Sequence, residues 1–303
     1  MKITHKDFEK VIVDSVSSRV ADIINSLDMR YDELTDFEKK DAFSKIKEIS
    51  ENDLKKSGKH RVLEWESGWM ENRNLLKENQ TFESVLPKYF GKFPYLRFDG
   101  RLVKQISKDL EYNMLCSLEY HYFEKYLSDA KNILEFGCGT GHNLFRARRI
   151  NDHANLTGLD WAESSQQILN ELNASNILKC DSRKFDFFEP DYSFCLKEES
   201  AIYTIAALEQ IGSSHDSFIS YILANKPKVC LHIEPIIELL SPQESFLDEQ
   251  CVLYCKKRNY LQGFLPKLRE LENDGKIEIL ETKRTNIGSF LIEGYSVIAW
   301  RPL

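Results

Sequence analysis

The chain has 303 residues, enough for one large domain or two modest ones. With 42% hydrophobic and 29% charged residues it has the composition of a soluble globular protein, and its net charge of −7 disfavours a protein that mainly grips a nucleic acid backbone. The polar N-terminus lacks the apolar core of a signal peptide, and no apolar run is long enough to span a membrane. We therefore expect a cytoplasmic protein that binds neither nucleic acid nor membranes.

The N-terminal third predicts helices followed by an ordered loop. Apolar residues recur at helical spacing from 5 to 28, and Thr35-x-x-Glu38 is a capping box that opens a second helix. A third helical segment, 61–77, places Trp65 and Trp69 on one face, where core packing is the preferred interpretation and an aromatic wall over a substrate the alternative. Residues 86–101, rich in proline, glycine, aromatics and cations, are typical of an ordered loop. We predict an N-terminal helical cap region over 1–107.

The central motif of the chain is Glu135-Phe-Gly-Cys-Gly-Thr-Gly141. It ends a short apolar run, 132–136, and a helix-like segment, 144–150, follows. Strand, glycine turn and helix form the first unit of a nucleotide-binding α/β sheet, where glycines let a ligand approach the backbone and the helix start attracts an anionic group. The G-x-G-x-G order differs from the G-x-G-x-x-G fingerprint of dinucleotide enzymes, which disfavours a nicotinamide oxidoreductase.

With an acid two residues before its first glycine, the motif resembles the first motif of class I S-adenosylmethionine-dependent methyltransferases, E/D-x-G-x-G-x-G. The resemblance covers about residues 110–303 and implies S-adenosylmethionine as cofactor and S-adenosylhomocysteine as product. It also implies a Rossmann-like, doubly wound and mostly parallel seven-stranded sheet with an antiparallel last strand, in a domain from 108 to 303. The alternation of strand-like and helix-like segments after residue 133 agrees with this fold class.

The residues expected to bind the cofactor follow the order of the strands. Asp160 ends the second predicted strand, 156–160, where an acid can accept hydrogen bonds from both ribose hydroxyls; a cap for the next helix is the alternative. Trp161 can stack on adenine. In the resembling family an acid after the third strand, predicted here at 176–181, meets the adenine amino group. The expected set is Glu135, Gly137, Gly139, Gly141, Asn143, Asp160, Trp161, Asp181 and Ser182.

Methyl transfer depends on positioning, and a base is needed only where the nucleophile carries a proton. Three side chains are candidate catalytic groups: Glu209 after the fourth predicted strand, Glu234 at the end of the fifth, and His215 in a polar loop. A place at a helix start is the alternative for His215. The two glutamates could bind a substrate hydroxyl, an amine or a divalent metal, but we expect no metal.

Two neighbouring residues are not expected to act as bases. His232 alternates with apolar residues inside a strand and is expected to be a hydrogen-bonded core histidine. Gln210 stands where many small-molecule methyltransferases have a histidine after Leu-Glu, and an amide cannot take up a proton at neutral pH.

The expected acceptor is a small metabolite or sugar, methylated on oxygen or nitrogen. Tyr89, Arg97, Arg101 and Arg258 are candidates for binding it, and the arginines would suit a phosphate or carboxylate. For the loop residues among them, packing on the domain is the alternative. A non-catalytic protein that keeps the fold for partner contacts is the second function considered. The sequence does not predict the oligomeric state.

Overall fold

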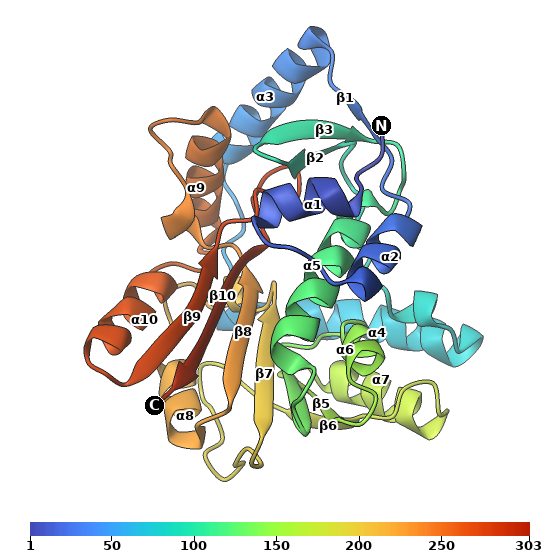
Figure 1. Ribbon diagram of the computed structural model, residues 1–303, viewed down its shortest axis with the longest axis vertical. Coiled ribbons are helices and arrows are strands. Elements are labelled where there is room, and N and C mark those ends of the chain that lie inside the picture. The colour runs from blue at the N-terminus through green and yellow to red at the C-terminus, as the bar shows by residue number, and fades with distance from the viewer.

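A seven-stranded sheet forms the centre of the computed structural model, which describes residues 1–303 (Figure 1). Its strands are β4 (Asn132–Phe136), β5 (Asn155–Asp160), β6 (Asp181–Lys184), β7 (Ser200–Ile205), β8 (Val229–Glu234), β9 (Ile277–Lys283) and β10 (Ser296–Pro302). They lie in the order β6-β5-β4-β7-β8-β10-β9, and β10 runs antiparallel to both of its neighbours while the other pairs are parallel. The predicted Rossmann-like sheet with an antiparallel last strand is confirmed.

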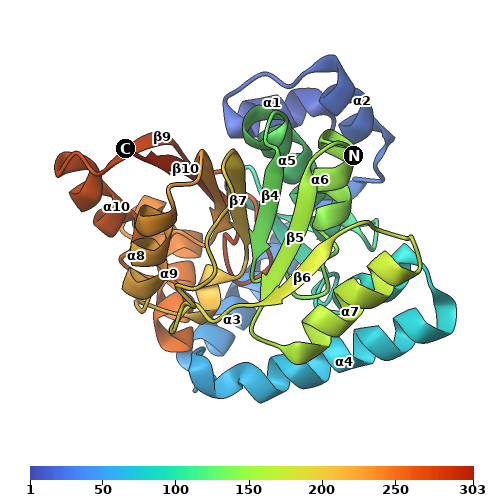
Figure 2. The ribbon, with the colours of Figure 1, turned by 90° about the horizontal axis from the view of Figure 1, so that it is seen from below.

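Alternate residues of the same strands build two hydrophobic cores, one on each face of the sheet. Ile133 and Tyr203 belong to the first core, which receives α5 (Leu110–Leu127), α6 (Leu144–Ile150) and α7 (Glu163–Ala174). Leu134 and Ile202 belong to the second, which receives α8 (Asp216–Asn225) and α10 (Phe264–Asn273). Figure 2 shows these helix groups on opposite sides of the strands.

The N-terminal region contains more than helices. Its helices are α1 (His5–Ile12), α2 (Ser18–Ser26), α3 (Asp36–Glu51) and α4 (Val62–Asn79), and a second sheet has the order β1-β3-β2, with β1 at Tyr31–Glu33, β2 at Tyr95–Phe98 and β3 at Arg101–Gln105. The single helix predicted over 5–28 is wrong, because the chain turns at Val13 with a positive φ of 50°. Part of the predicted loop is a hairpin, whose turn residues Asp99 and Gly100 both have positive φ.

The N-terminal region shares its core with the sheet domain. The first core joins Phe8 and Ile24 of α1 and α2 to strand residues of the central sheet. In a smaller core, α3 and the small sheet pack against α9 (Phe246–Arg258) and Phe290. Both α9 and Phe290 come from the C-terminal third of the chain. The boundary at residue 107 stays a prediction, and the N-terminal region packs against α9 and the connection between β9 and β10.

The third strand starts later than predicted. Residues 176–180 close the end of α7, since Asn176 has a φ of 54° and Ile177 N–H donates to the Leu172 carbonyl, and Leu178 packs into the core from this turn. β6 therefore begins at Asp181, which pairs with Thr157 at the amino end of β5.

Four single turns of 3-10 helix complete the chain: η1 (Lys59–Arg61), η2 (Phe82–Val85), η3 (Leu208–Gln210) and η4 (Ile237–Leu239). No helix combines the length and apolar character needed to cross a membrane.

Candidate functional site

The glycine turn after β4 needs its glycines for three different reasons. Gly137, Gly139 and Gly141 all have positive φ, a region that side chains with a Cβ rarely adopt. A Cβ at Gly137 would overlap Ala207 after β7, and one at Gly141 would overlap Leu169 of α7. At Gly139 it would lie 2.9 Å from Cζ2 of Trp69. The outer glycines thus permit packing within the sheet domain, while the middle one faces a helix of the cap.

Glu135 and Asn143 fasten the two ends of this turn to each other. The Asn143 amide donates to Glu135 Oε1 at 2.7 Å, and the Tyr203 hydroxyl donates to Oε2 at 3.0 Å. Glu135 is fully buried beneath the turn, and burial raises its pKa to about 8. The structure therefore places Glu135 as a support for the turn, outside the cleft described below, whereas Asn143 also lines that cleft.

The turn lies where the sheet changes winding direction. β5 and β6 follow on one side of β4, and β7 and β8 on the other, so the turns after β4 and β7 meet at the carboxyl edge, where open α/β sheets bind ligands. Asp160 ends β5 at this edge and accepts from Gly139 N–H at 2.8 Å and Ala162 N–H at 2.9 Å. Ala206, after β7, has a φ of 48°, a strained conformation of the kind found at functional sites.

An open cleft with about 1320 Å³ of empty space lies along this edge. Its floor consists of the glycine turn and Ile205–Ala206. Its walls come from α4, the loop 89–93, the last turns of α9 and the connection 289–295. A side pocket of about 470 Å³ shares Gly137 and Ala206 with the cleft and reaches Asp160. The site thus consists of a narrow apolar pocket that continues into a wider cleft with a mixed polar and apolar lining.

The side pocket is largely aromatic. Trp161 follows Asp160 and Phe187 follows β6, and both line the pocket. The acid nearest this carboxyl end of β6 is Asp186, beside Phe187, and it forms an ion pair with Lys59 at 3.5 Å. Asp181 and Ser182 lie at the other end of the strand, and Asp181 is exposed. The expectation for those two residues came from the misplaced strand start, and the structure does not bring them to the site.

Helix α4 covers the pocket with its two tryptophans. Trp65 and Trp69 line both cavities, with ring centroids 5.3 Å apart. The helix runs alongside α7 (Figure 2). The N-cap position of α7 is Ala162, whose side chain cannot accept a hydrogen bond. Glu66 of α4 caps it instead, because the Ser164 N–H donates to its carboxylate at 3.0 Å. The tryptophans therefore line both cavities, and Trp69 also packs against the first core, as the core-packing interpretation expects.

Two carboxyl groups of the cleft have raised pKa values. Burial, and next the charge of Glu234, raise the pKa of Glu209 to about 8, and its carboxylate accepts from the Gln210 amide at 2.8 Å. Burial raises the pKa of Glu111 to about 7, although the Tyr295 hydroxyl donates to it at 3.1 Å. Such groups exchange protons near neutral pH, which a catalytic acid or base requires.

The other predicted catalytic groups lie outside the cleft. Glu234 is fully buried and accepts from the N–H groups of Ala207 and Leu208 at 3.0 and 3.1 Å, so it caps η3 and orients Glu209. His215 precedes α8 and its Nε2 contacts the Gln262 carbonyl at 3.0 Å, in agreement with the helix-start alternative. His232 is a core histidine, as predicted, with Thr204 on one ring nitrogen and Trp300 on the other.

Two of the four predicted acceptor-binding residues reach the cleft. Tyr89 and Arg258 line it. Arg97 is buried and donates to the carbonyls of Leu247 and Leu291 at 3.0 and 2.9 Å, so it joins the small sheet to α9 and to the connection before β10. Arg101 is exposed on β3 and pairs with Glu33 at 3.2 Å. Neither of these two arginines contacts the cleft.

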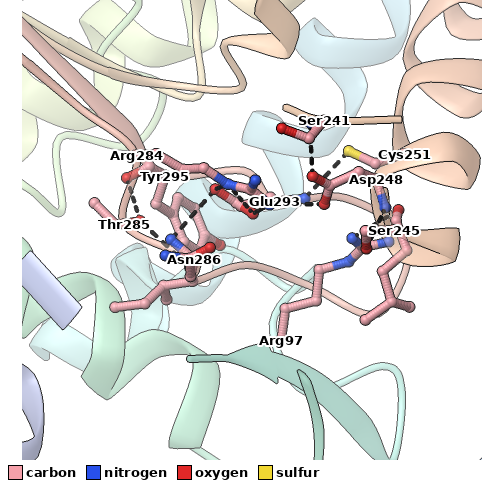
Figure 3. Close-up of polar contacts among 12 residues, drawn as sticks. Arg97, Ser241, Ser245, Asp248, Cys251, Arg284, Thr285, Asn286, Glu293 and Tyr295 are labelled. Carbon is pink, nitrogen blue, oxygen red and sulfur yellow. Dashed lines mark hydrogen bonds and ion pairs between the residues drawn. The ribbon is translucent and has the colours of Figure 1, made fainter. Parts of the chain in front are cut away.

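An ion cluster joins α9 to the connection between β9 and β10 (Figure 3). Arg284 donates to Glu293 at 2.7 Å and to Asp248 of α9 at 2.6 Å, and both carboxylates are almost completely buried. The Glu293 carboxylate also accepts from Asn286 N–H at 3.2 Å, and its own N–H donates to Cys251 Sγ at 3.4 Å. The cluster holds residues 289–295 against α9, and so shapes the cleft.

The sequence analysis missed several polar residues of the cleft, among them Arg61, Lys92, Glu111 and His142. Arg61 lies in the predicted helical segment 61–77, and helical spacing alone does not show which face of a helix meets a distant strand edge. His142 directly follows the glycine motif. That position was the available signal, but the motif carries no expectation for its side chain.

No family model and no curated sequence matches the chain. Human N-acetylserotonin methyltransferase in complex with S-adenosylmethionine aligns over 62% of this chain and 52% of its own, with 13% identity and a TM-score of 0.44, so the chain spans about half of that enzyme. The plantazolicin methyltransferase BpumL in complex with S-adenosylhomocysteine aligns over 86% and 98%, with 14% identity and a TM-score of 0.44. The [4+2]-cyclase SpnF aligns over 78% and 94%, with 17% identity and a TM-score of 0.48.

These identities are too low to transfer a function from any of the three proteins. Strand order and the glycine turn of this chain are those of the Rossmann-like fold of class I S-adenosylmethionine-dependent methyltransferases and related enzymes.

Proposed function

We propose that the protein is an S-adenosylmethionine-dependent methyltransferase that acts on an oxygen or nitrogen of a small molecule. The observation that carries this proposal is the joining of two cavities at the switch point of the sheet. The side pocket adjoins Asp160 and the glycine turn, and the cleft beside it is wide enough for a second molecule. A transferase that brings two substrates together needs such an arrangement.

The side pocket fits the adenosine half of the cofactor. Asp160 supplies a carboxylate for the ribose hydroxyls, and Trp161 and Phe187 supply flat apolar surfaces for adenine. Gly139 has the positive φ that the turn requires, and the Trp69 ring covers the position where its Cβ would lie. S-adenosylmethionine supplies a methyl group on a positively charged sulfur.

Glu209 is our candidate for the base. It lines the cleft next to the turn after β7, and its pKa of about 8 suits proton uptake from a hydroxyl or an ammonium group. Tyr89 and Arg258 contribute acceptor-binding groups on two other walls. Exclusion of water from a reaction between two bound molecules would keep electrostatic interactions in the site strong.

The test is calorimetric titration with S-adenosylmethionine, S-adenosylhomocysteine and NAD. We expect micromolar binding of the two sulfur compounds and none of NAD. Asp160→Ala should abolish that binding, and Asp181→Ala, the matched control at the opposite end of the neighbouring strand, should retain it. Absence of binding by both sulfur compounds, with and without a screened acceptor, would refute the proposal.

One observation favours a second candidate, a non-catalytic protein that retains the fold. Asp160 already accepts from two backbone N–H groups, and Trp69 lies against Gly139, so groups of the protein itself already contact two positions that a cofactor would use. A protein that binds neither sulfur compound but keeps a defined partner would fit this candidate.

A further inference from the structure

Glu209 is linked to the N-terminal cap through the side chain of Gln210. The Gln210 amide nitrogen donates to Glu209 Oε1 at 2.8 Å, and Arg61 Nη1 donates to the Gln210 amide oxygen at 3.0 Å. All three residues line the cleft. Two hydrogen bonds therefore connect a cation of the cap, through a neutral amide, to the candidate base at the edge of the sheet.

The chemistry of the two end groups fixes the direction of the amide between them. A guanidinium group only donates hydrogen bonds, so the atom of Gln210 that faces Arg61 is the amide oxygen. The amide nitrogen then faces Glu209, where it can only donate. Arg61 is thus the group that keeps a donor, and not an acceptor, against the Glu209 carboxylate.

Further contacts hold both ends of this connection. Glu234 accepts from the backbone N–H of Glu209 at 3.3 Å, and Arg61 Cζ lies 5.4 Å from the centroid of the Trp65 ring. Glu209 itself is only partly buried, and its second carboxyl oxygen, Oε2, accepts no hydrogen bond within the protein. One oxygen of the carboxylate is therefore held by Gln210, and the other is left for a ligand.

The hydrogen bond from Gln210 favours the ionised form of Glu209. Burial and then the charge of Glu234 raise the pKa of Glu209 to about 8, and the amide donor opposes them because it stabilises the carboxylate. The charges of Arg258 and Arg61 act in the same direction as the amide. Without Gln210, Glu209 would therefore ionise only at a higher pH.

The other titratable groups near Glu209 do not change charge where it titrates, apart from Glu234, whose pKa burial raises to about 7 and which ionises first. The charge of Glu209 raises the pKa of five neighbours: Tyr89, Tyr254, Cys255, Tyr260 and Tyr295. Burial raises the pKa of the four tyrosines more strongly, and a hydrogen bond with Cys251 is the first cause for Cys255. These five groups stay neutral.

We propose that Gln210 is a positioning residue for Glu209, and that Arg61 fixes its amide so that one carboxylate oxygen is held while the other receives the proton of the acceptor. This inference rests on the proposed function, because it takes Glu209 as the base. The proton passes from the hydroxyl or ammonium group of the acceptor to Glu209 Oε2, and Gln210 neither gains nor loses one. A side chain of the cap thereby helps to orient a group of the sheet domain.

The first test measures the pKa of Glu209 in the cofactor-free protein. Carbon-13 spectra of protein labelled at the glutamate carboxyl groups give the titration, and the signal is assigned by its loss in Glu209→Gln. Gln210→Met keeps the length of the side chain but cannot donate, and should raise this pKa by about one pH unit. Gln243→Met, at an exposed glutamine, is the matched control and should leave the pKa unchanged. An unchanged pKa in a folded Gln210→Met protein would overturn the inference.

A double-mutant cycle separates the charge of Arg61 from its hydrogen bond to Gln210. If Arg61 acts through the amide, Arg61→Met should raise the pKa of Glu209 more in the otherwise unsubstituted protein than in Gln210→Met. Arg269→Met, at an exposed arginine of α10, should raise it in neither protein. Equal effects of Arg61→Met in both proteins would show that Arg61 acts by its charge alone and would refute its part in the proposal.

The Gln210 amide gives a readout in the unsubstituted protein, which covers the case in which the variants do not fold. As the pH rises, its N–H proton resonance should move downfield with the midpoint of the Glu209 titration, because an ionised carboxylate is the stronger acceptor. Gln210 amide resonances that do not follow the titration of Glu209 would contradict the proposal.

Methyl-transfer rates add a readout that a purely structural role would not change. In Gln210→Met the inflection of kcat should move upward by about one pH unit, so that the rate falls about tenfold at pH 7 but recovers at higher pH, with an unchanged KM for S-adenosylmethionine. A loss of equal size at every pH would indicate a structural role only. The spectra need neither cofactor nor methyl transfer, so failure of S-adenosylmethionine binding would refute the proposed function alone, whereas an unchanged Glu209 pKa beside normal binding would refute only this inference.

Discussion

The indole of Trp69 lies against Gly139, and a Cβ added to that glycine would come within 2.9 Å of Cζ2. The contact joins a helix from the N-terminal cap to the middle of the glycine turn. The same helix is held to the sheet domain by Glu66, which caps α7, and by Arg73, which donates to Glu171 at 2.7 Å. The cap therefore forms part of the candidate site.

Trp69→Ala should weaken binding of S-adenosylhomocysteine about tenfold, because the pocket loses an aromatic wall over the glycine turn. Leu63→Ala, on the same helix with a side chain that is 76% exposed, is the matched control and should bind normally. Calorimetry measures both. Tighter binding by Trp69→Ala would mean that the indole occupies space that the ligand needs.

Glu209→Gln should lower the rate of methyl transfer by about 10²- to 10⁴-fold, because an amide cannot take up the acceptor's proton. In the unsubstituted protein the base acts only when ionised, so the rate should rise as the pH increases through about 8, the pKa of Glu209. Initial rates across pH 6–10, with an acceptor found by screening small hydroxyl compounds and amines, give this profile. His215→Gln should retain the rate, since His215 lies outside the cleft; an equal loss in both variants would argue against Glu209 as the base.

Arg284→Gln should reduce the free energy of unfolding by about 3 kcal/mol, because it leaves the buried carboxylates of Glu293 and Asp248 without a counter-ion. Arg301→Gln breaks an ion pair with Glu278 that is about half exposed, and should cost less than about 1 kcal/mol. Urea unfolding compares the two variants. Equal losses would show that the ion cluster is no more important for stability than a surface pair.

The free energy of unfolding should fall as the pH rises from about 4.5 to 8, because Glu135 is buried in its protonated form. In the unfolded chain its carboxyl ionises near 4.5, whereas in the folded protein it stays protonated up to a pKa of about 8. Between these values the folded state binds the extra proton, so each pH unit upward favours unfolding by up to about 1.4 kcal/mol. Glu135→Gln removes this contribution.

Melting temperatures across pH 5–8 measure the effect. The decline should be shallower in Glu135→Gln than in the unsubstituted protein or in Glu244→Gln, a variant at an exposed site. Parallel curves for all three proteins would contradict burial of a protonated Glu135.

Local patterns predicted the centre of the fold correctly. The acid and three glycines after a short apolar run specify a strand and a turn, because few residues tolerate the positive φ found at Gly137, Gly139 and Gly141. A short apolar segment can form a strand or close a helix, and here the prediction was wrong: Ile177 and Leu178 were assigned to a strand but close α7. Because of this error, Asp181, the acid expected near adenine, lies at the beginning of β6 and not at its end.

The sequence by itself determined the sheet, its glycine turn and the place of Asp160, because these depend on periodicity and backbone conformation within short segments. Only the tertiary structure decided which side chains share the cleft. Arg97 and Arg258 look alike in the sequence, yet the first binds two buried carbonyls and the second lines the cleft. Such roles depend on contacts between segments far apart in the chain, and no local pattern encodes them.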